Sequence, residues 1–155
     1  MCIRDRQKVE ASIFSVLGGG FNYNLVKDQP DVAQYIMDFN HWYDPTNPKA
    51  QAMRKRVEAR NTMFTFEVYC GYNAVRCYLD AVERAGTADR EKVIAALEAS
   101  TWSDHFMPYG PTKFVNGQNT GGQAALLQAS KTDIDVIWPG KFASAKAVFP
   151  RPKFS

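Results

Sequence analysis

The residues of this chain that could perform acid–base or metal chemistry are few and scattered. The two histidines, His41 and His105, lie 64 positions apart, and the residues around them show no spacing typical of metal ligands. The chain also contains no nucleophile elbow. Four glutamates could in principle pair as acid and base, but nothing in the sequence places two of them together: Glu58, Glu67, Glu83 and Glu98. The sequence therefore favours binding over catalysis, with a hydrolase as the weaker alternative.

The glycine triplet Gly18–Gly20 and the histidine at 105 each allow two interpretations. The triplet could hold a phosphate group, but neither a dinucleotide fingerprint nor a P-loop lysine follows it, which favours a turn after a strand. Asp104 and His105 lie in a polar segment between an expected helix and an expected strand. We therefore expect His105 to lie at the surface or to pack within a turn, and not to act as a general base.

Two of the three cysteines, Cys70 and Cys77, fall on one expected helix. Seven helical residues separate them by about 10.5 Å, whereas a disulfide needs Cα atoms within about 7 Å. They cannot bridge each other, and we expect both to pack as small apolar side chains.

Residues 66–119 predict the elements that would position such side chains. Gly86 ends a long helix, because glycine enters the left-handed cap conformation without steric cost. Asp89 is the expected N-cap of a second helix, and residues 107–119 predict a short strand between turn residues. The long helix carries one apolar stripe at a 3.6-residue period, made of Val68, Tyr72, Val75, Leu79 and Val82, and a charged face of Arg76, Asp80 and Arg84.

The remaining segments alternate between strand and helix patterns. Strands are expected over residues 9–17 and over residues 33–39, where alternate apolar residues show a two-residue period. Asn47 and Pro48 predict the N-cap and the first position of a further helix. Residues 124–128 and 134–138 predict a hairpin joined by a polar turn. This alternation indicates an α/β protein.

Composition and charge exclude several classes of protein. The 155 residues are 45% apolar and 23% charged, as in a soluble globular domain, and the net charge is +3. The basic cluster of residues 54–60 is better explained as a solvated helix face than as a nucleic-acid patch. No apolar run reaches the ~18 residues that span a bilayer. Residues 1–6 resemble a translated sequencing adapter, and we expect the natural protein to begin upstream.

Several segments, in this order, resemble the C-terminal part of the type I periplasmic binding proteins, the solute receptors of ABC importers for branched-chain amino acids, amides and urea. The resemblance covers about residues 9–154 and is carried by residues 71–75, 80–86, 107–110, 114, 117–119 and 148–152. It implies a truncated two-lobe α/β fold with parallel sheets flanked by helices. Residues 7–42 would belong to the second lobe, 43–120 to the first, and 121–155 to a return hairpin and tail of the second. The exposed surface left by truncation predicts poor solubility.

The resemblance also implies a ligand site in the cleft between the lobes. In relatives, the loop after the strand that ends near residue 17 often carries an acid for the ligand's ammonium group, but the corresponding residues 18–23 contain none. The sharper hypothesis is that Glu67, at the start of the long helix, takes over the acceptor role, with Phe21, Tyr23 and Tyr69 as walls and Gly20 as a further ligand-binding position. The alternative is that Glu67 is a solvated first-turn acid favoured by the helix dipole.

The function implied by the resemblance is capture of an amino acid, amide or urea by hinge closure, without enzyme activity, cofactor or nucleic acid. The implied partners are the permease subunits of an ABC importer, and the implied location is periplasmic or extracytoplasmic, with a signal peptide upstream. A ligand-sensing regulator of the same fold is the alternative.

Overall fold

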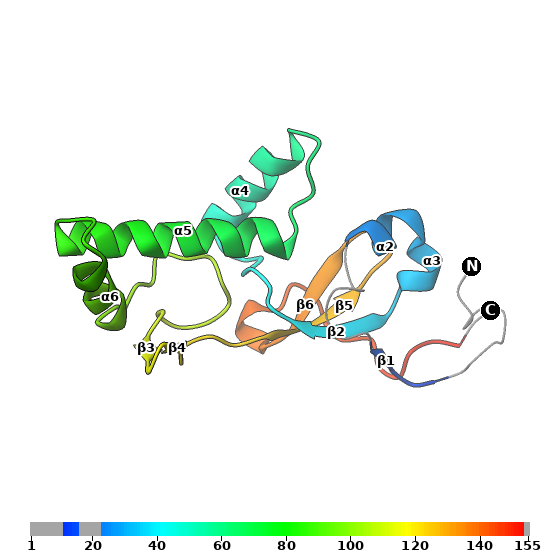
Figure 1. Cartoon of the computed structure of the whole chain (residues 1–155). Coiled ribbons are helices and arrows are strands. Elements are labelled where there is room, and N and C mark those ends of the chain that lie inside the picture. Colours follow the sequence, from blue (N-terminus) through cyan, green and yellow to red (C-terminus); the bar gives the residue numbers. More distant parts are fainter. Residues whose placement is uncertain (1–10, 16–22, 154–155) are drawn as a thin grey trace. The chain divides into compact units, whose positions relative to one another are not determined.

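The computed structural model describes residues 11–15 and 23–153 and divides the chain into two compact units. Unit 1 comprises Met1–Thr46 and Ala124–Ser155, and unit 2 comprises Asn47–Gln123. The predictions made for the glycine triplet and for the first six residues lie outside the described residues, as do Gly20 and Phe21 of the expected site. The colours of Figure 1 follow the chain from one unit to the other and back.

Unit 1 is built on a four-stranded sheet in the order β1-β2-β5-β6 (Figure 1). The parallel pair consists of β1 (Phe14–Ser15) and β2 (Ile36–Asn40), whereas β5 (Ala125–Ala129) and β6 (Ile134–Trp138) join by antiparallel pairing. The sheet is thus mixed, where the sequence had predicted parallel sheets. The predicted final hairpin is confirmed, and its turn is closed by the bond from the Ser130 N–H to the Asp133 carbonyl (2.9 Å).

Two short helices that the sequence analysis did not anticipate connect β1 to β2. They are α2 (Tyr23–Asp28) and α3 (Pro30–Ala33), and they contribute Val26 and Ala33 to the core of unit 1. The strand predicted over residues 33–39 was therefore wrong at its start. Pro30 begins a helix that contains Ala33, and Tyr35 then takes a left-handed conformation (φ 69°) before β2 begins.

The alternating pattern predicted for this strand was also wrong about its faces. Met37 is buried, but so are Ile36 and Asp38, whereas Phe39 is 52% exposed. β2 lies between β1 and β5, so both of its edges are hydrogen-bonded within the sheet. Asp38 is accommodated by local bonds: one carboxylate oxygen accepts from the Phe39 N–H (2.8 Å) and the other from the Asn40 side-chain amide (3.2 Å).

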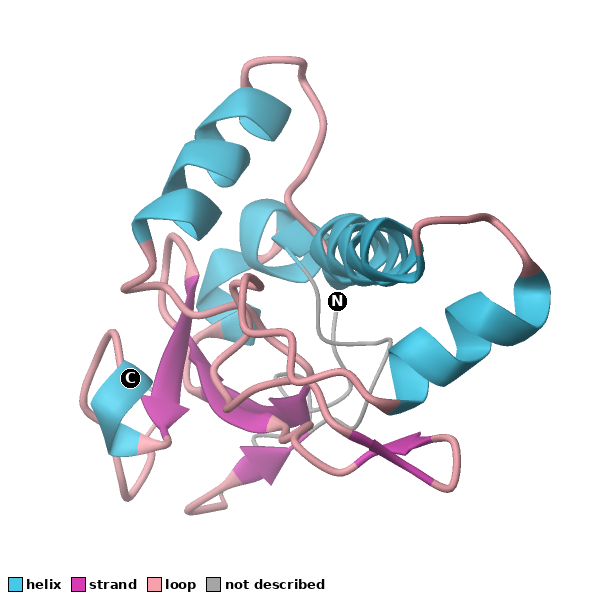
Figure 2. Cartoon of the chain, turned by 90° about the vertical axis from the view of Figure 1, so that its left-hand side faces the viewer, coloured by secondary structure: helices cyan, strands magenta, loops and turns pink. Residues whose placement is uncertain are grey.

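Unit 2 contains the three helices that the sequence predicted, namely α4 (Pro48–Glu58), α5 (Phe66–Ala85) and α6 (Arg90–Glu98). The predicted caps are confirmed. Asn47 accepts from the Lys49 N–H (2.9 Å), and Asp89 accepts from the Lys92 N–H (3.1 Å). α5 ends at Gly86, which has a left-handed φ of 63°. Figure 2 views α5 almost along its axis, with α6 beside it.

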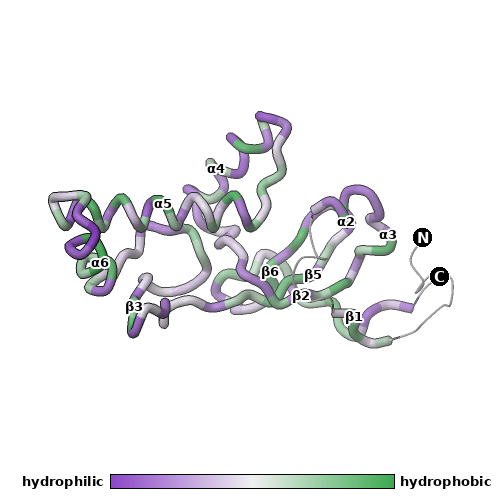
Figure 3. The backbone as a smooth tube through the Cα atoms, viewed as in Figure 1, coloured by the Kyte–Doolittle hydropathy of each residue, from purple (hydrophilic) through white to green (hydrophobic). Residues whose placement is uncertain are grey.

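Helix α5 carries apolar side chains on two faces, and Figure 3 shows hydrophobic and hydrophilic residues mixed along its length. The face that packs into unit 2 contains its buried residues: Tyr69, Asn73, Cys77 and Ala81. The apolar stripe that the sequence emphasised lies beside that face and is largely exposed, with Tyr72 at 41%, Val75 at 59% and Leu79 at 46%. The most apolar stripe of this helix is therefore not the one that unit 2 buries.

The single strand expected between residues 107 and 119 is in fact a small hairpin of β3 (Phe114–Val115) and β4 (Gln118–Asn119). Its turn residues, Asn116 and Gly117, have φ values of 51° and 76°. Two positive φ values in a two-residue loop define a type I′ turn, for which Asn-Gly is the preferred pair. That pair was visible in the sequence and was the signal for a hairpin.

Replacement by alanine is expected to change the free energy of unfolding in opposite directions at Gly86 and at Gly71. We expect Gly86→Ala to destabilise the protein by about 1–2 kcal/mol, which is the cost of placing an L-residue in the left-handed conformation. No atom lies within 4 Å of the added Cβ, so a steric clash adds nothing to this cost. The control, Gly71→Ala in the interior of α5, also meets no atom and should stabilise by about 0.5–1 kcal/mol. Urea unfolding followed by circular dichroism measures both, and a shift of both midpoints in one direction would contradict the assignment.

Candidate functional site

Glu67 lies in the first turn of α5 and is exposed to solvent. The helix begins here because Thr65 takes an extended conformation (φ −90°, ψ 169°), while the residues from Phe66 onward are helical. The first N–H groups of a helix have no partner within it and give this end a partial positive charge. That charge stabilises the carboxylate of Glu67, which is placed where it can accept a hydrogen bond from a cation.

An aromatic cluster lies behind the start of α5. The ring centroids of Phe64 and Tyr69 are 5.2 Å apart, and those of Phe64 and Phe106 are 6.4 Å apart. Tyr72 stacks on Phe106 at 5.4 Å. Because Tyr69 is fully buried in this cluster, it supports the helix start in this structure, and its role as a ligand wall stays a prediction. The exposed aromatic side chain next to Glu67 is Phe66 (38%), which sequence reasoning had noted only as a neighbour.

Tyr23, the described member of the predicted site in unit 1, opens α2 and is half-buried. Its ring centroid lies 5.7 Å from that of Trp42, which in turn lies 5.9 Å from that of Tyr43. Trp42 and Tyr43 are almost completely buried. These two residues were missed as part of the site, although adjacent aromatics before Asp44-Pro45 were a visible signal. Their rings form a rigid support behind Tyr23.

The chain passes from unit 1 to unit 2 directly after this aromatic pair, and Asp44 shapes the passage. One Asp44 carboxylate oxygen accepts from the Thr46 N–H (2.8 Å) and from the Thr46 hydroxyl (2.6 Å). This is an Asx-turn, which holds the backbone just before the N-cap of α4. Asp44 is buried and bonded to a residue two positions away, so its carboxylate stabilises the local backbone.

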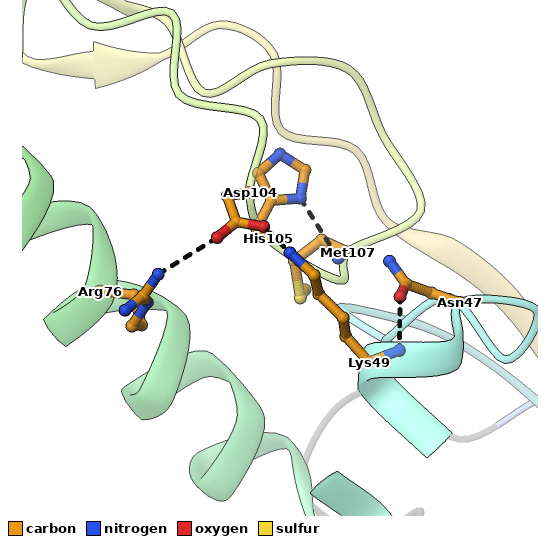
Figure 4. Close-up of polar contacts among 6 residues, drawn as sticks. All are labelled: Asn47, Lys49, Arg76, Asp104, His105 and Met107. Atoms are coloured by element: carbon orange, nitrogen blue, oxygen red, sulfur yellow. Dashed lines mark hydrogen bonds and ion pairs between the residues drawn. The ribbon is translucent and has the colours of Figure 1, made fainter. Parts of the chain in front are cut away.

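Within unit 2, Asp104 joins three segments through two ion pairs, which Figure 4 shows. Its carboxylate binds the Lys49 ammonium group at the start of α4 and the Arg76 guanidinium in the middle of α5 (3.1 Å). The hydrogen bond from Lys49 is the main reason why the pKa of Asp104 is lowered. Both pairs are exposed, so each contributes under about 1 kcal/mol. The expected pair of Asp80 and Arg84 is confirmed (2.8 Å).

His105 packs inside the loop that follows Asp104 and is buried. The Met107 N–H donates to Nδ1 (3.3 Å), and Nε2 lies 3.0 Å from the Gly110 carbonyl oxygen, to which it donates. One ring nitrogen therefore accepts and the other donates, as only the neutral imidazole can. Burial lowers the pKa of His105, against a smaller opposing effect of the Gly110 bond. The expectation of a histidine packed within a turn is confirmed.

The buried neutral His105 should make stability depend on pH. Its pKa is lowered from the ordinary value of 6.5, so below that value the unfolded chain binds a proton that the folded chain does not. We expect the free energy of unfolding to be constant above about pH 7 and to fall as the pH drops below 6.5. Urea titrations between pH 8 and pH 5 measure this slope.

The controls for this pH dependence are two histidine variants. His105→Gln keeps a donor and an acceptor but cannot titrate, so its stability should lose the decline below pH 6.5. His41→Gln replaces an exposed histidine and should retain the decline. An unchanged slope in His105→Gln would show that other groups cause it.

The described part of the chain offers little for other chemistry. Within residues 11–15 and 23–153, no three histidine, cysteine, aspartate or glutamate side chains are grouped so that they could hold a metal ion. In the same residues, no helix has the length and apolar character needed to cross a membrane. Cys70 and Cys77 are free thiols, as expected from their spacing. Within unit 2, the exposed carboxylate of Glu67 and the exposed ring of Phe66 are side chains that a polar solute could contact.

Comparisons with known proteins give two positive results. A family model described as periplasmic binding protein matches residues 8–133. The fold is similar to that of LivK, a leucine-binding protein from Thermotoga maritima, with a TM-score of 0.66 and 18% sequence identity. The similarity covers 86% of this chain and 38% of that one. No curated protein matches.

Proposed function

We propose that this chain, which belongs to the periplasmic binding protein family, forms part of an extracytoplasmic receptor that captures a small solute. The observation that carries the proposal is the family match over residues 8–133, and the LivK-like fold supports it. The predicted α/β fold of a type I periplasmic binding protein is confirmed. The chain spans 38% of the length of the leucine-binding protein, so the activity proposed is that of the whole protein.

The proposed arrangement assigns the two units to different lobes. Unit 1 would contribute to the second lobe and unit 2 to the first, and the chain would cross between lobes near residues 40–46 and 121–124. The Asx-turn of Asp44 and Thr46 lies in the first crossing, just before α4, and hinge residues are typically a few loop or element-terminal positions. In this family, hinge closure of the lobes encloses the solute.

The proposed ligand is an amino acid, with a small amide or urea as the alternative within the same family. Glu67 would accept a hydrogen bond from the ligand's ammonium or amide group, which its exposure and its position in the first turn support. Tyr23 would supply an aromatic wall, supported from behind by Trp42. The proposed site also retains Gly20, Phe21 and Tyr69, and the proposed partners are the permease subunits of an ABC importer.

The test is a thermal-shift screen of the whole protein. The ligands are branched-chain amino acids, small amides and urea, with a sugar as the control solute. Binding at 100 times the dissociation constant stabilises the folded state by about 2.7 kcal/mol, which should raise the melting temperature by several degrees. If no ligand of these classes shifts the melting temperature, the proposed solute class is wrong.

A further inference from the structure

Unit 2 contains a cavity of about 180 Å³ between α5 and the segment that runs from Trp102 to β4. From α5 it is lined by Cys70, Asn73, Ala74 and Cys77. The other walls come from the loop and hairpin, including Trp102, His105, Met107 and Phe114. His105 and Met107 appear in Figure 4. All of these residues belong to unit 2, and Glu67 of the proposed solute site is not among the residues that line the cavity.

The side chain of Asn73 lines this cavity, and its polar atoms are buried without an evident reason. Its side chain is 7% exposed, and neither its amide nitrogen nor its amide oxygen has a hydrogen-bond partner among the described residues. An unsatisfied buried polar group destabilises the folded state, and here a donor and an acceptor of one side chain are both unsatisfied. Native proteins rarely leave such groups unpaired, so a complementary group is expected in the cavity.

The chemistry of the walls restricts what that group can be. His105 is neutral, because its two ring nitrogens act as one acceptor and one donor. Burial raises the pKa of Cys70 and of Tyr109, so both are uncharged at neutral pH. The lining is otherwise mainly aliphatic, aromatic and sulfur-containing. A charged ligand would lose its hydration here without gaining a counter-charge.

Water alone fits this cavity poorly. Its volume could hold about six water molecules at roughly 30 Å³ each, but each would need two to four polar partners. Among the described residues that line the cavity, Asn73 is the one whose buried side-chain polar atoms lack a partner. A single molecule that pairs with both amide atoms and places apolar atoms against the walls would satisfy the site better.

We propose that this cavity is a second binding site, which takes a small primary carboxamide. The ligand's carbonyl oxygen would accept from Asn73 Nδ2, its NH₂ group would donate to Asn73 Oδ1, and its short alkyl chain would lie against Met107 and Trp102. This reciprocal pair uses the donor and the acceptor that the structure leaves unsatisfied. The site is independent of hinge closure, because all of its residues come from one unit.

The test is a titration of the whole protein with propionamide, in which the ¹⁵N NMR signals of side-chain amides are recorded. Loss of one signal pair in Asn73→Leu identifies the Asn73 amide. We expect a saturable shift of that pair with a millimolar dissociation constant, as suits a ligand of about five heavy atoms. Propionate, which has the same shape but a charge, should give no saturable shift.

A second variant tests the cavity without removing the amide. Ala74→Leu keeps Asn73 but fills space at the wall, and it should weaken propionamide binding at least tenfold while the melting temperature shows that the chain is folded. The Glu91→Gln variant, altered at a residue of α6 that does not line the cavity, should bind propionamide unchanged. The proposal is overturned if the Asn73 signals of the folded chain do not shift when propionamide is added up to a 100-fold excess. It is also overturned if Ala74→Leu binds propionamide as tightly as the unaltered chain. In either case the cavity holds water only.

Discussion

Replacement of Glu67 by glutamine is expected to weaken amino-acid binding by the whole protein about 10- to 100-fold. The reason is that the proposed ligand ammonium would lose a charged acceptor, and hydrogen bonds to charged groups contribute about 1.5–3 kcal/mol. Glu67 is exposed in the first turn of α5, at the positive end of the helix dipole. Isothermal titration calorimetry of the unaltered protein and the variant with the same ligand measures the difference.

Glu91 provides the matched control for Glu67. It is also the second residue of a helix and is strongly exposed, but it lies at the start of α6. Both glutamine variants should lose about 0.3–1 kcal/mol of dipole stabilisation, whereas only Glu67→Gln should lose affinity. Equal affinity in the two variants would leave Glu67 as a solvated first-turn acid and exclude it from the ligand site.

The second large effect is expected at Gly121, just after β4. A Cβ added here would lie 2.3 Å from the Pro111 carbonyl oxygen, so the backbone must move to admit it. We expect Gly121→Ala to destabilise the protein by about 1–3 kcal/mol, the usual cost of overpacking. The position is held by Asn119, whose side-chain oxygen accepts from the N–H groups of Lys113 (3.2 Å) and Gly121 (3.1 Å). The midpoint of urea unfolding measures this loss.

The next residue serves as the control for Gly121. At Gly122 an added Cβ would have its nearest contact with the Asn119 carbonyl oxygen at 3.4 Å, an ordinary van der Waals distance. Gly122→Ala should therefore change the free energy of unfolding by less than about 0.5 kcal/mol. Similar losses in both variants would mean that the loop tolerates neither side chain for a reason other than the contact with Pro111.

The helix ends and turns of this protein could be predicted because they are decided by neighbours in the sequence. The capping bonds of Asn47 and Asp89 span two and three residues. The left-handed stop at Gly86 depends on one residue. The hairpin turn at Asn116-Gly117 is likewise decided by its own two residues, although the sequence analysis predicted a single strand there.

The candidate site was only partly accessible from the sequence. The position of Glu67 in the first turn of α5 follows from the helix pattern, and the structure describes it as exposed. Tyr69 was expected as a wall, but whether its ring meets solvent depends on Phe64, which packs on it at 5.2 Å. Likewise, the support of Tyr23 by Trp42 joins residues 19 positions apart. No local pattern specifies such contacts.

The sequence by itself thus determined the helices of unit 2, their caps, the last hairpin and the resemblance to the family. Only the tertiary structure decided that α5 buries Asn73 in place of Val75, that Asp38 is buried while Phe39 is exposed, and that Asp104 pairs with Lys49, 55 residues away. The physical reason is that hydrogen bonds at caps and turns act over a few residues, whereas burial and long-range ion pairs depend on what the rest of the chain places opposite each face.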